Sequence, residues 1–202
     1  MVKDKDSEVK EGEYALLESM FPKAKDLTIK EIMKSAPYSS YERNNSYLKS
    51  LAKKKIIEGK KIGKTYVFSL ISDNWSSKKA FYSYALERSK TFSGANKIIS
   101  LALKEIPEED TELIMIFGSY SKGIPGADSD IDLIIVSENK EKVDVDLTSI
   151  RRRYNLKIHP IIIPKTEFIK IKNENKELWA SLVANGIIFK GYELFYHYAY
   201  TN

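Results

Sequence analysis

The sequence predicts an α+β protein of two modules joined by a helical connector. Three short helical segments followed by a hairpin signal fill residues 12–71, and a helix-prone stretch follows over residues 72–105. From residue 106 to residue 202, short apolar runs alternate with helical segments, which is the pattern of a small mixed sheet backed by helices. A chain of 202 residues can hold one medium domain or two small ones, and this division favours two.

Composition excludes several classes of protein. The chain has no cysteine and only two histidines, His159 and His197, which excludes a disulfide framework, a cysteine nucleophile, thiolate metal sites and a histidine-rich metal centre. No apolar run approaches the length of about 18 residues that a membrane span needs, and the charged N-terminal segment lacks the apolar core of a secretory signal. We therefore expect a cytoplasmic protein without a membrane partner.

The net charge of +5 hides an uneven distribution. Residues 21–70 hold eleven lysines and Arg43 against four acidic residues, a net charge of +8, whereas residues 71–202 are neutral as a whole. A basic block of this kind indicates a module that faces a polyanion. The alternative is a lysine-rich surface that serves only solubility.

The basic block carries the signals of three helices and a hairpin. Helices are predicted over residues 13–21, 28–35 and 39–54, and the capping boxes Thr28–Glu31 and Ser39–Glu42 open the last two. Strands are predicted over residues 56–61 and 65–70, with a tight turn between them. This order resembles a winged helix-turn-helix over residues 12–71, and the likeness rests on pattern rather than on an invariant motif.

The resemblance implies that the third helix enters the major groove of double-stranded DNA. Its predicted outward positions carry Arg and Asn, which pair with base edges, and the wing carries lysines suited to phosphates. The residues that we expect to contact DNA are Arg43, Asn44, Asn45 and Lys49 on this helix and Lys60, Lys61 and Lys64 on the wing. The alternative is a winged helix used only for protein contact or dimerisation, and a homodimer is expected by analogy with regulators of this type.

Residues 72–105 form the expected connector. The polar segment 72–77 predicts the domain boundary, with Trp75 packed against the protein. The following residues predict one long helix or two abutting helices, with a bend at Ser93–Gly94. Aromatic residues around Phe81 recur at helical spacing, which favours a core stripe over a ligand site.

Two predicted strands of the C-terminal module bring reactive groups together. Leu113–Phe117 is a buried strand that ends at Gly118–Ser119, where glycine lets the backbone approach a phosphate and the amides and hydroxyl can hold it. Asp130 and Asp132 lie two residues apart on the strand 129–136, so their carboxylates project from one face and repel each other. A hard cation such as Mg²⁺, bound together with substrate phosphates, relieves that repulsion.

The stretch FGSYSKG followed by SDIDLIIV resembles the signature of the polymerase-beta-type nucleotidyltransferases, and within them the minimal nucleotidyltransferases. The resemblance covers residues 113–136. It implies that Gly118 and Ser119 contact the phosphates of a nucleoside triphosphate, and that Asp130 and Asp132 ligate Mg²⁺. It also implies in-line attack by a substrate hydroxyl with release of pyrophosphate, and it allows a helical toxin-like protein as a partner.

The sequence departs from the family pattern at one position. The family carries a third carboxylate on the following strand, and the corresponding residue of the predicted strand 156–163 is His159. His159 is then a substitute catalytic base, an ordinary strand residue of an inactive domain, or a surface residue whose register is misassigned. Asp144 and Asp146 fall on the predicted helix 143–154 and are badly placed for this role.

Two functions are compatible with these patterns. The first is a nucleotidyltransferase that binds Mg-NTP and transfers a nucleoside monophosphate to a hydroxyl acceptor. The second is a DNA-binding regulator or antitoxin-like protein whose transferase domain is weak or inactive. The glycine, serine and aspartate set favours the first function, and the winged helix with His159 favours the second.

Overall fold

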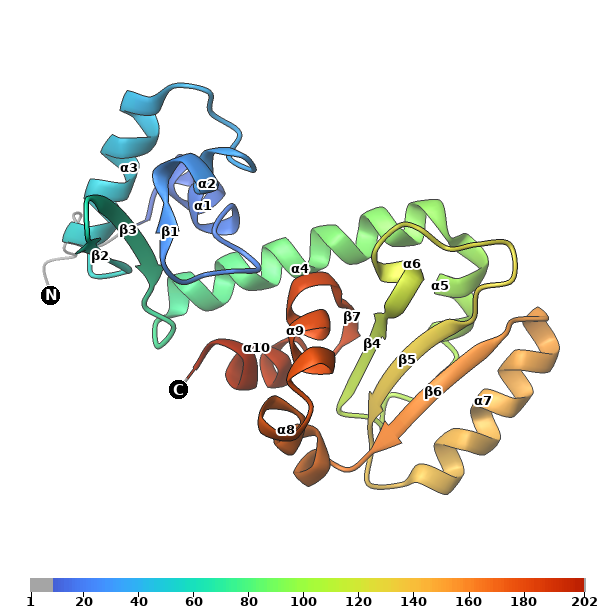
Figure 1. Ribbon diagram of the computed structural model, residues 1–202. Coiled ribbons are helices and arrows are strands. Elements are labelled where there is room, and N and C mark those ends of the chain that lie inside the picture. The colour runs from blue at the N-terminus through green and yellow to red at the C-terminus, as the bar shows by residue number, and fades with distance from the viewer. Residues whose placement is uncertain (1–8, 202) are drawn as a thin grey trace, which may run out of the picture. The chain divides into compact units, whose positions relative to one another are not determined.

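The computed structural model describes residues 9–201, which divide into two units (Figure 1). The N-terminal unit holds the described residues up to Tyr84 together with Tyr200 and Thr201, and the C-terminal unit holds Ala85–Ala199. Both units combine helices with a small sheet, so the predicted α+β class is confirmed. Within the described residues, no helix is both long enough and apolar enough to cross a membrane.

The N-terminal unit contains one antiparallel sheet in the strand order β1-β3-β2. Its elements are α1 (Glu11–Glu18), β1 (Leu27–Thr28), α2 (Ile29–Met33), α3 (Tyr41–Lys53), β2 (Ile57–Ile62) and β3 (Thr65–Leu70), followed by the first part of α4 (Trp75–Ala95). The hairpin of β2 and β3 turns at Gly63, whose φ of 58° is in the left-handed region that glycine adopts without strain. β1 has no counterpart among the predicted strands, because two residues carry no detectable periodicity.

Side-chain caps fix where α2 and α3 begin. At α2 the Thr28 hydroxyl accepts from the Glu31 amide, and the Glu31 carboxylate accepts from the Thr28 amide, which confirms the predicted capping box. The hydrogen bond from the Thr28 amide is the main reason why the pKa of Glu31 falls to about 2. At α3 the prediction is wrong by one residue: Ser40 rather than Ser39 caps the helix, so Glu42 lies one position too early to complete a box.

An aromatic cluster and one ion pair hold the N-terminal unit together. The rings of Phe21, Phe81 and Tyr200 are mutually in contact, with centroids 5.4, 5.2 and 5.3 Å apart. Glu13 on α1 and Lys54 at the end of α3 form an ion pair of 2.7 Å, and their side chains are only 1% and 9% exposed. The ion pair therefore joins two helices from inside the unit.

Two expectations for the connector are wrong. Trp75 is 69% exposed, because the inward position of this turn is taken by buried Ser77, whose hydroxyl donates to the Ile71 carbonyl. α4 also continues through Gly94 without interruption and ends at Ala95, before Asn96, whose φ of −127° and ψ of 58° lie outside the helical region. The break between the two helices therefore falls at Asn96, two residues after the glycine.

The C-terminal unit is built on a four-stranded mixed sheet in the order β6-β5-β4-β7 (Figure 1). β4 is antiparallel to β5 and β7, whereas β5 and β6 are parallel and are joined by the crossover helix α7. The elements are α5 (Lys97–Leu103), β4 (Leu113–Phe117), α6 (Gly118–Ser121), β5 (Ile131–Val136), α7 (Lys140–Tyr154), β6 (Ile158–Ile163), α8 (Lys165–Glu174), α9 (Lys176–Asn185), β7 (Ile187–Lys190) and α10 (Tyr192–Tyr200).

Alternation along the strands gives this sheet two different faces. One face, which we call the core face, packs with α5 and α7 through buried side chains such as Leu133 and Leu147. The opposite face, the Asp132 face, carries Asp132 and Met115, and Gly186 at the end of α9 lies against the Met115 side chain. The core thus supports the strands from one side and leaves the acidic residue on the other.

Candidate functional site

Gly118 lies where β4 ends and α6 begins, in direct contact with Asp132. The pairing of Phe117 with Asp132 across β4 and β5 brings the two segments together. Gly118 has a φ of 71°, and a Cβ atom at this position would collide with the Asp132 carboxylate. The positive φ and the lack of room for a Cβ atom each require glycine at this position. The amides of the first turn of α6, which have no intrahelical partners, are therefore next to a carboxylate.

Ser119 is the second residue of α6 and is half-buried. Its carbonyl accepts from the Ile124 amide at 3.1 Å, which ties the following loop to the helix. In the part of the chain that the structure describes, the Ser119 hydroxyl makes no hydrogen bond. This hydroxyl is consequently available to a ligand.

The two predicted carboxylates occupy different positions at the start of β5. Asp132 is the second residue of the strand, and its side chain is 29% exposed. Asp130 is exposed and lies in the loop just before the strand, which begins two residues later than expected. Asp132 is therefore fixed by strand pairing, whereas Asp130 is set by the conformation of the loop.

His159 lies beside Asp132 on the neighbouring strand. The parallel register of β5 and β6 pairs the two residues, and His159 Nδ1 is 3.7 Å from Asp132 Oδ1. This distance is too long for a hydrogen bond but is within ion-pair range for a protonated imidazole. The His159 side chain is 75% exposed. A misassigned register is therefore excluded, and the interpretations as a substitute base and as an ordinary strand residue remain.

The donor set suits a cation that is shared with a substrate. Within residues 9–201, no three histidine or acidic side chains gather into a group that could hold a metal ion by themselves. Asp130 and Asp132 supply two hard oxygen donors at the start of β5. Mg²⁺ usually keeps several waters and binds through one or two carboxylates plus substrate phosphates, and two carboxylates beside the Gly118–Ser119 turn fit that mode.

Asp144 and Asp146 are on the wrong side of the sheet for this site. Both lie on α7, which packs on the core face. Asp144 is 4.0 Å from Arg151 in an exposed ion pair. One carboxylate oxygen of Asp146 is buried without a hydrogen-bond partner among the described residues. Neither residue supplies the missing third carboxylate.

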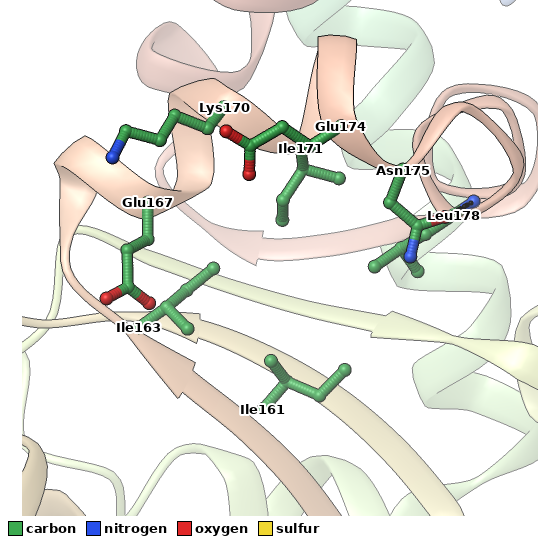
Figure 2. A pocket seen from close by; sticks show the side chains of 8 residues that line it. All are labelled: Ile161, Ile163, Glu167, Lys170, Ile171, Glu174, Asn175 and Leu178. Atoms are coloured by element: carbon green, nitrogen blue, oxygen red, sulfur yellow. Dashed lines mark hydrogen bonds between the residues drawn. The ribbon is translucent and has the colours of Figure 1, made fainter.

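A pocket of about 420 Å³ opens on the Asp132 face, further along β6 than His159. The side chains that line it are shown in Figure 2. Ile161 and Ile163 line it from β6, on the same side as His159 because strand side chains alternate. Figure 2 shows Glu167 of α8 directed toward Ile163, with Lys170 further along the helix. Ile163 is four residues from His159, or about 13 Å along the strand, so Glu167 does not replace the third carboxylate.

The outward residues of α3 are partly as predicted. Arg43 and Lys49 are exposed, and Asn45 is half-buried. The Arg43 guanidinium lies 5.2 Å from the centre of the Tyr38 ring. Tyr41, Asn45 and Lys49 line a shallow pocket of about 390 Å³ on this surface.

The prediction that Asn44 contacts DNA is corrected by its position in the structure. Asn44 is completely buried, and its Nδ2 donates to the carbonyls of Tyr38 and Ser40, both at 2.8 Å. Asn44 lies four residues before the buried Leu48 and so shares the inward side of α3. Its side chain stabilises the segment that leads into the helix and does not reach a base.

The three predicted lysines of the hairpin are exposed, but they differ in their partners. Lys60 Nζ is 2.8 Å from Asp26 Oδ1, and this hydrogen bond raises the pKa of Lys60 and lowers the pKa of Asp26. Lys61 and Lys64 have no ion pair or hydrogen bond among the described residues. The contact with Asp26 was not predictable from local sequence, because it joins residues 34 positions apart.

Comparison with known proteins finds a similarity that covers part of the chain. The family model described as "Polymerase beta, Nucleotidyltransferase" matches residues 96–192. A toxin-antitoxin crystallised with AMP-PNP is 24% identical with a TM-score of 0.35, covering 52% of this chain and 82% of that one. A candidate nucleotidyltransferase from Sulfolobus solfataricus is 21% identical with a TM-score of 0.28, covering 52% of this chain and 85% of that one. Comparison with curated proteins gives no match. The residues that match this family model include Gly118, Asp132 and His159.

Proposed function

We propose that the C-terminal unit binds a nucleoside triphosphate with Mg²⁺ through Gly118, Ser119, Asp130 and Asp132. The observation that carries the proposal is the contact between Gly118 and the Asp132 carboxylate. A phosphate-binding turn and a cation-binding carboxylate can act on one nucleotide only when they are adjacent. The amides of α6 and the Ser119 hydroxyl hold phosphate oxygens, and the two aspartates hold the cation. When bound, Mg²⁺ supplies positive charge that offsets the charge on the transferring phosphate.

We further propose that this nucleotide donates a nucleoside monophosphate to a hydroxyl acceptor. The acceptor oxygen forms a bond to the α-phosphorus, the bond from that phosphorus to the bridging oxygen breaks, and pyrophosphate leaves. His159, which is exposed beside Asp132, takes the proton of the hydroxyl. The pocket at Ile161 and Ile163 lies further along β6 on the Asp132 face and receives the body of the acceptor.

Turnover and nucleotide affinity together test this proposal. The protein is incubated with Mg²⁺ and labelled ATP, GTP, CTP or UTP, and release of pyrophosphate is followed beside the Kd of each nucleotide. Asp130→Asn/Asp132→Asn is expected to lose both activity and Mg-dependent binding. The matched control Glu141→Gln/Asp144→Asn removes two exposed charges from α7 and is expected to retain both. Binding that is unchanged in the Asp130/Asp132 variant would contradict the site.

His159 decides between an active and an inactive domain. If it is the base, His159→Ala lowers turnover while the Kd of the nucleotide stays the same. If wild type binds Mg-NTP through Asp130 and Asp132 but no acceptor supports turnover, the domain senses nucleotide instead. In that case the protein is a regulator or an antitoxin-like protein with a separate helical partner.

We also propose that residues 12–71 form a winged helix-turn-helix that binds double-stranded DNA. Support comes from the order of three helices and a hairpin, from the net charge of +8 in residues 21–70, and from exposed Arg43 and Lys49 on α3. The expected contacts are Arg43, Asn45, Lys49, Lys60, Lys61 and Lys64, without the buried Asn44.

The salt dependence of duplex binding tests this second proposal. Fluorescence anisotropy with a labelled duplex is expected to show affinity that falls steeply between about 50 and 200 mM salt. Lys60→Glu/Lys61→Glu/Lys64→Glu is expected to abolish binding. The control Lys97→Glu/Lys140→Glu/Lys176→Glu makes the same change of charge in the C-terminal unit and is expected to preserve it. Binding that does not respond to salt, or equal losses in both variants, would refute the DNA contact.

A further inference from the structure

The C-terminal unit contains a second, larger pocket that is separate from the Asp132 face. Its volume is about 680 Å³, within the range of roughly 300–1,000 Å³ typical of small-molecule sites. Ile114 of β4 and Phe189 of β7 line it, and both belong to the core face. Ile114 is near the start of β4, whereas Gly118 follows the end of that strand. The pocket therefore opens on the other face and at the other end of the sheet from Asp132.

The floor of this pocket is apolar. Ile114, Leu103 and Ile106 are 2–3% exposed and belong to the main core. Phe189 packs edge-on against Phe92, with ring centroids 5.9 Å apart, which fixes its orientation. A ligand on this floor would contact rigid hydrocarbon surface, which favours a ligand with an apolar body.

The rim of the same pocket is positively charged. Lys90 of α4, Lys104 after α5 and Lys190 of β7 line it, against Glu108 as the one acidic lining residue, which gives a net charge of +2. The side chains of Lys90 and Lys104 make no ion pair or hydrogen bond in the described part of the chain. Lys190 Nζ donates to the Glu108 carbonyl and to Thr111 Oγ1, neither of which carries a negative charge.

We propose that this pocket binds a small amphipathic organic anion, whose hydrocarbon body lies on the apolar floor and whose carboxylate lies among the three lysines. Two features support this class of ligand, one against a neutral ligand and the other against a simple inorganic anion. Lysine ammonium groups beside a low-dielectric wall attract an anion more strongly than they do in bulk water. Burial of a hydrocarbon body on the apolar floor also favours binding, and simple inorganic anions have no such body.

Octanoate and 1-octanol provide a direct test, because they share a chain and differ in charge. Binding is followed by methyl NMR of the full-length protein and by calorimetry. Octanoate is expected to shift the methyl signals of Leu103, Ile106 and Ile114 and to bind about tenfold more tightly than 1-octanol. Its affinity is expected to fall with added salt. Acetate, which has the charge without the chain, is expected to leave these signals unchanged.

Charge-reversal variants locate the anion. Lys90→Glu/Lys104→Glu is expected to weaken octanoate roughly tenfold and to leave 1-octanol unchanged. The control Lys97→Glu/Lys176→Glu reverses two exposed lysines of the same unit that do not line the pocket, and it is expected to bind octanoate as wild type does. The methyl spectra of the free variants confirm folding. Equal affinities for octanoate and 1-octanol, equal losses in both variants, or shifts centred on Gly118 and Asp132 would each overturn the proposal.

Discussion

At the scale of single residues, two glycines share a backbone conformation and differ in their surroundings. Gly118 and Gly123 have φ values of 71° and 73°. A Cβ at Gly118 would collide with the Asp132 carboxylate, whereas a Cβ at Gly123 would have no atom within 4 Å. Alanine substitutions at these two positions therefore separate the free-energy cost of backbone strain from the cost of displacing Asp132.

We predict that Gly123→Ala lowers the free energy of unfolding by about 1–2 kcal/mol and preserves the affinity for Mg-ATP. Gly118→Ala is expected to cost more and to abolish binding, because Asp132 must move away from the α6 amides. Urea unfolding and calorimetric titration measure the two effects. Equal affinities in the two alanine variants would mean that the contact with Asp132 does not form the site.

Asn44 and Asn45 are adjacent residues with opposite surroundings. Asn44 is buried and donates two hydrogen bonds to carbonyls that precede α3, whereas Asn45 is half-buried on the outer surface. We predict that Asn44→Ala lowers the free energy of unfolding by about 1–3 kcal/mol, since it removes both hydrogen bonds that this buried side chain donates. Asn45→Ala is expected to change it by less than about 0.5 kcal/mol. A larger loss of stability for Asn45 than for Asn44 would contradict these placements.

At the scale of elements, a buried ion pair joins α1 to the end of α3. Burial acts to raise the pKa of Glu13, but hydrogen bonds from Lys54, Ser50 and the Lys10 amide outweigh it and lower the pKa below 4.5. A lowered carboxyl pKa means that the stabilisation is complete above about pH 4.5 and is lost as the pH falls through the folded-state pKa. Acid should therefore loosen the contact between these helices.

We predict that Glu13→Gln lowers the free energy of unfolding by about 3 kcal/mol near pH 7, because it leaves the Lys54 charge buried. The difference from wild type is expected to shrink below about pH 4.5, where Glu13 becomes protonated as well. Asp128→Asn breaks the exposed pair with Lys157 and is the control, with an expected change of less than about 1 kcal/mol. Denaturant unfolding across this pH range would contradict the prediction if Glu13→Gln matched wild type at pH 7.

The elements that the sequence predicts best are those with strong local signals. β3 and β4 lie at residues 65–70 and 113–117, as predicted, because each is an apolar run between turn-forming residues. The approach of Gly118 to Asp132 is also encoded locally, in a strand, a short loop and a returning strand. Helix ends are predicted less accurately, and α1 begins two residues before the predicted start.

Contacts between distant segments were not predictable from local pattern. The burial of Asn44, the pairing of β1 with β3 and the ion pair of Lys60 with Asp26 all depend on tertiary packing. The exposure of Trp75 has the same origin, since Ser77 rather than the indole occupies the inward position of that turn. Periodicity describes one segment at a time, and none of these features belongs to one segment.

At the scale of the whole molecule, the N-terminal unit includes a residue from the far end of the chain. Tyr200 is buried, its ring contacts Phe21 and Phe81, and its hydroxyl donates to the Pro22 carbonyl at 3.0 Å. We predict that Tyr200→Ala lowers the free energy of unfolding of this unit by about 3–5 kcal/mol, because it leaves a cavity among aromatic rings. Tyr200→Phe keeps the ring, loses one hydrogen bond and is expected to cost about 1 kcal/mol.

Hydrogen exchange resolves the effect by unit. Amides of α1 and β3 are expected to exchange faster in Tyr200→Ala, and amides of β4 and β5 are expected to change less. Uniform acceleration across both units, or none in the N-terminal unit, would show that Tyr200 is not part of its core.

The position of Tyr200 also sets the order in which the protein matures during synthesis. The ribosome releases α1 to β3 first, but the aromatic cluster of Phe21 and Phe81 lacks its third ring until Ala85–Ala199 have been made. Domains generally fold in the order of synthesis, and here the first unit to emerge is the last to complete its packing. A chain that terminates early would therefore expose these two rings to chaperones and proteases, whereas the full-length chain buries them.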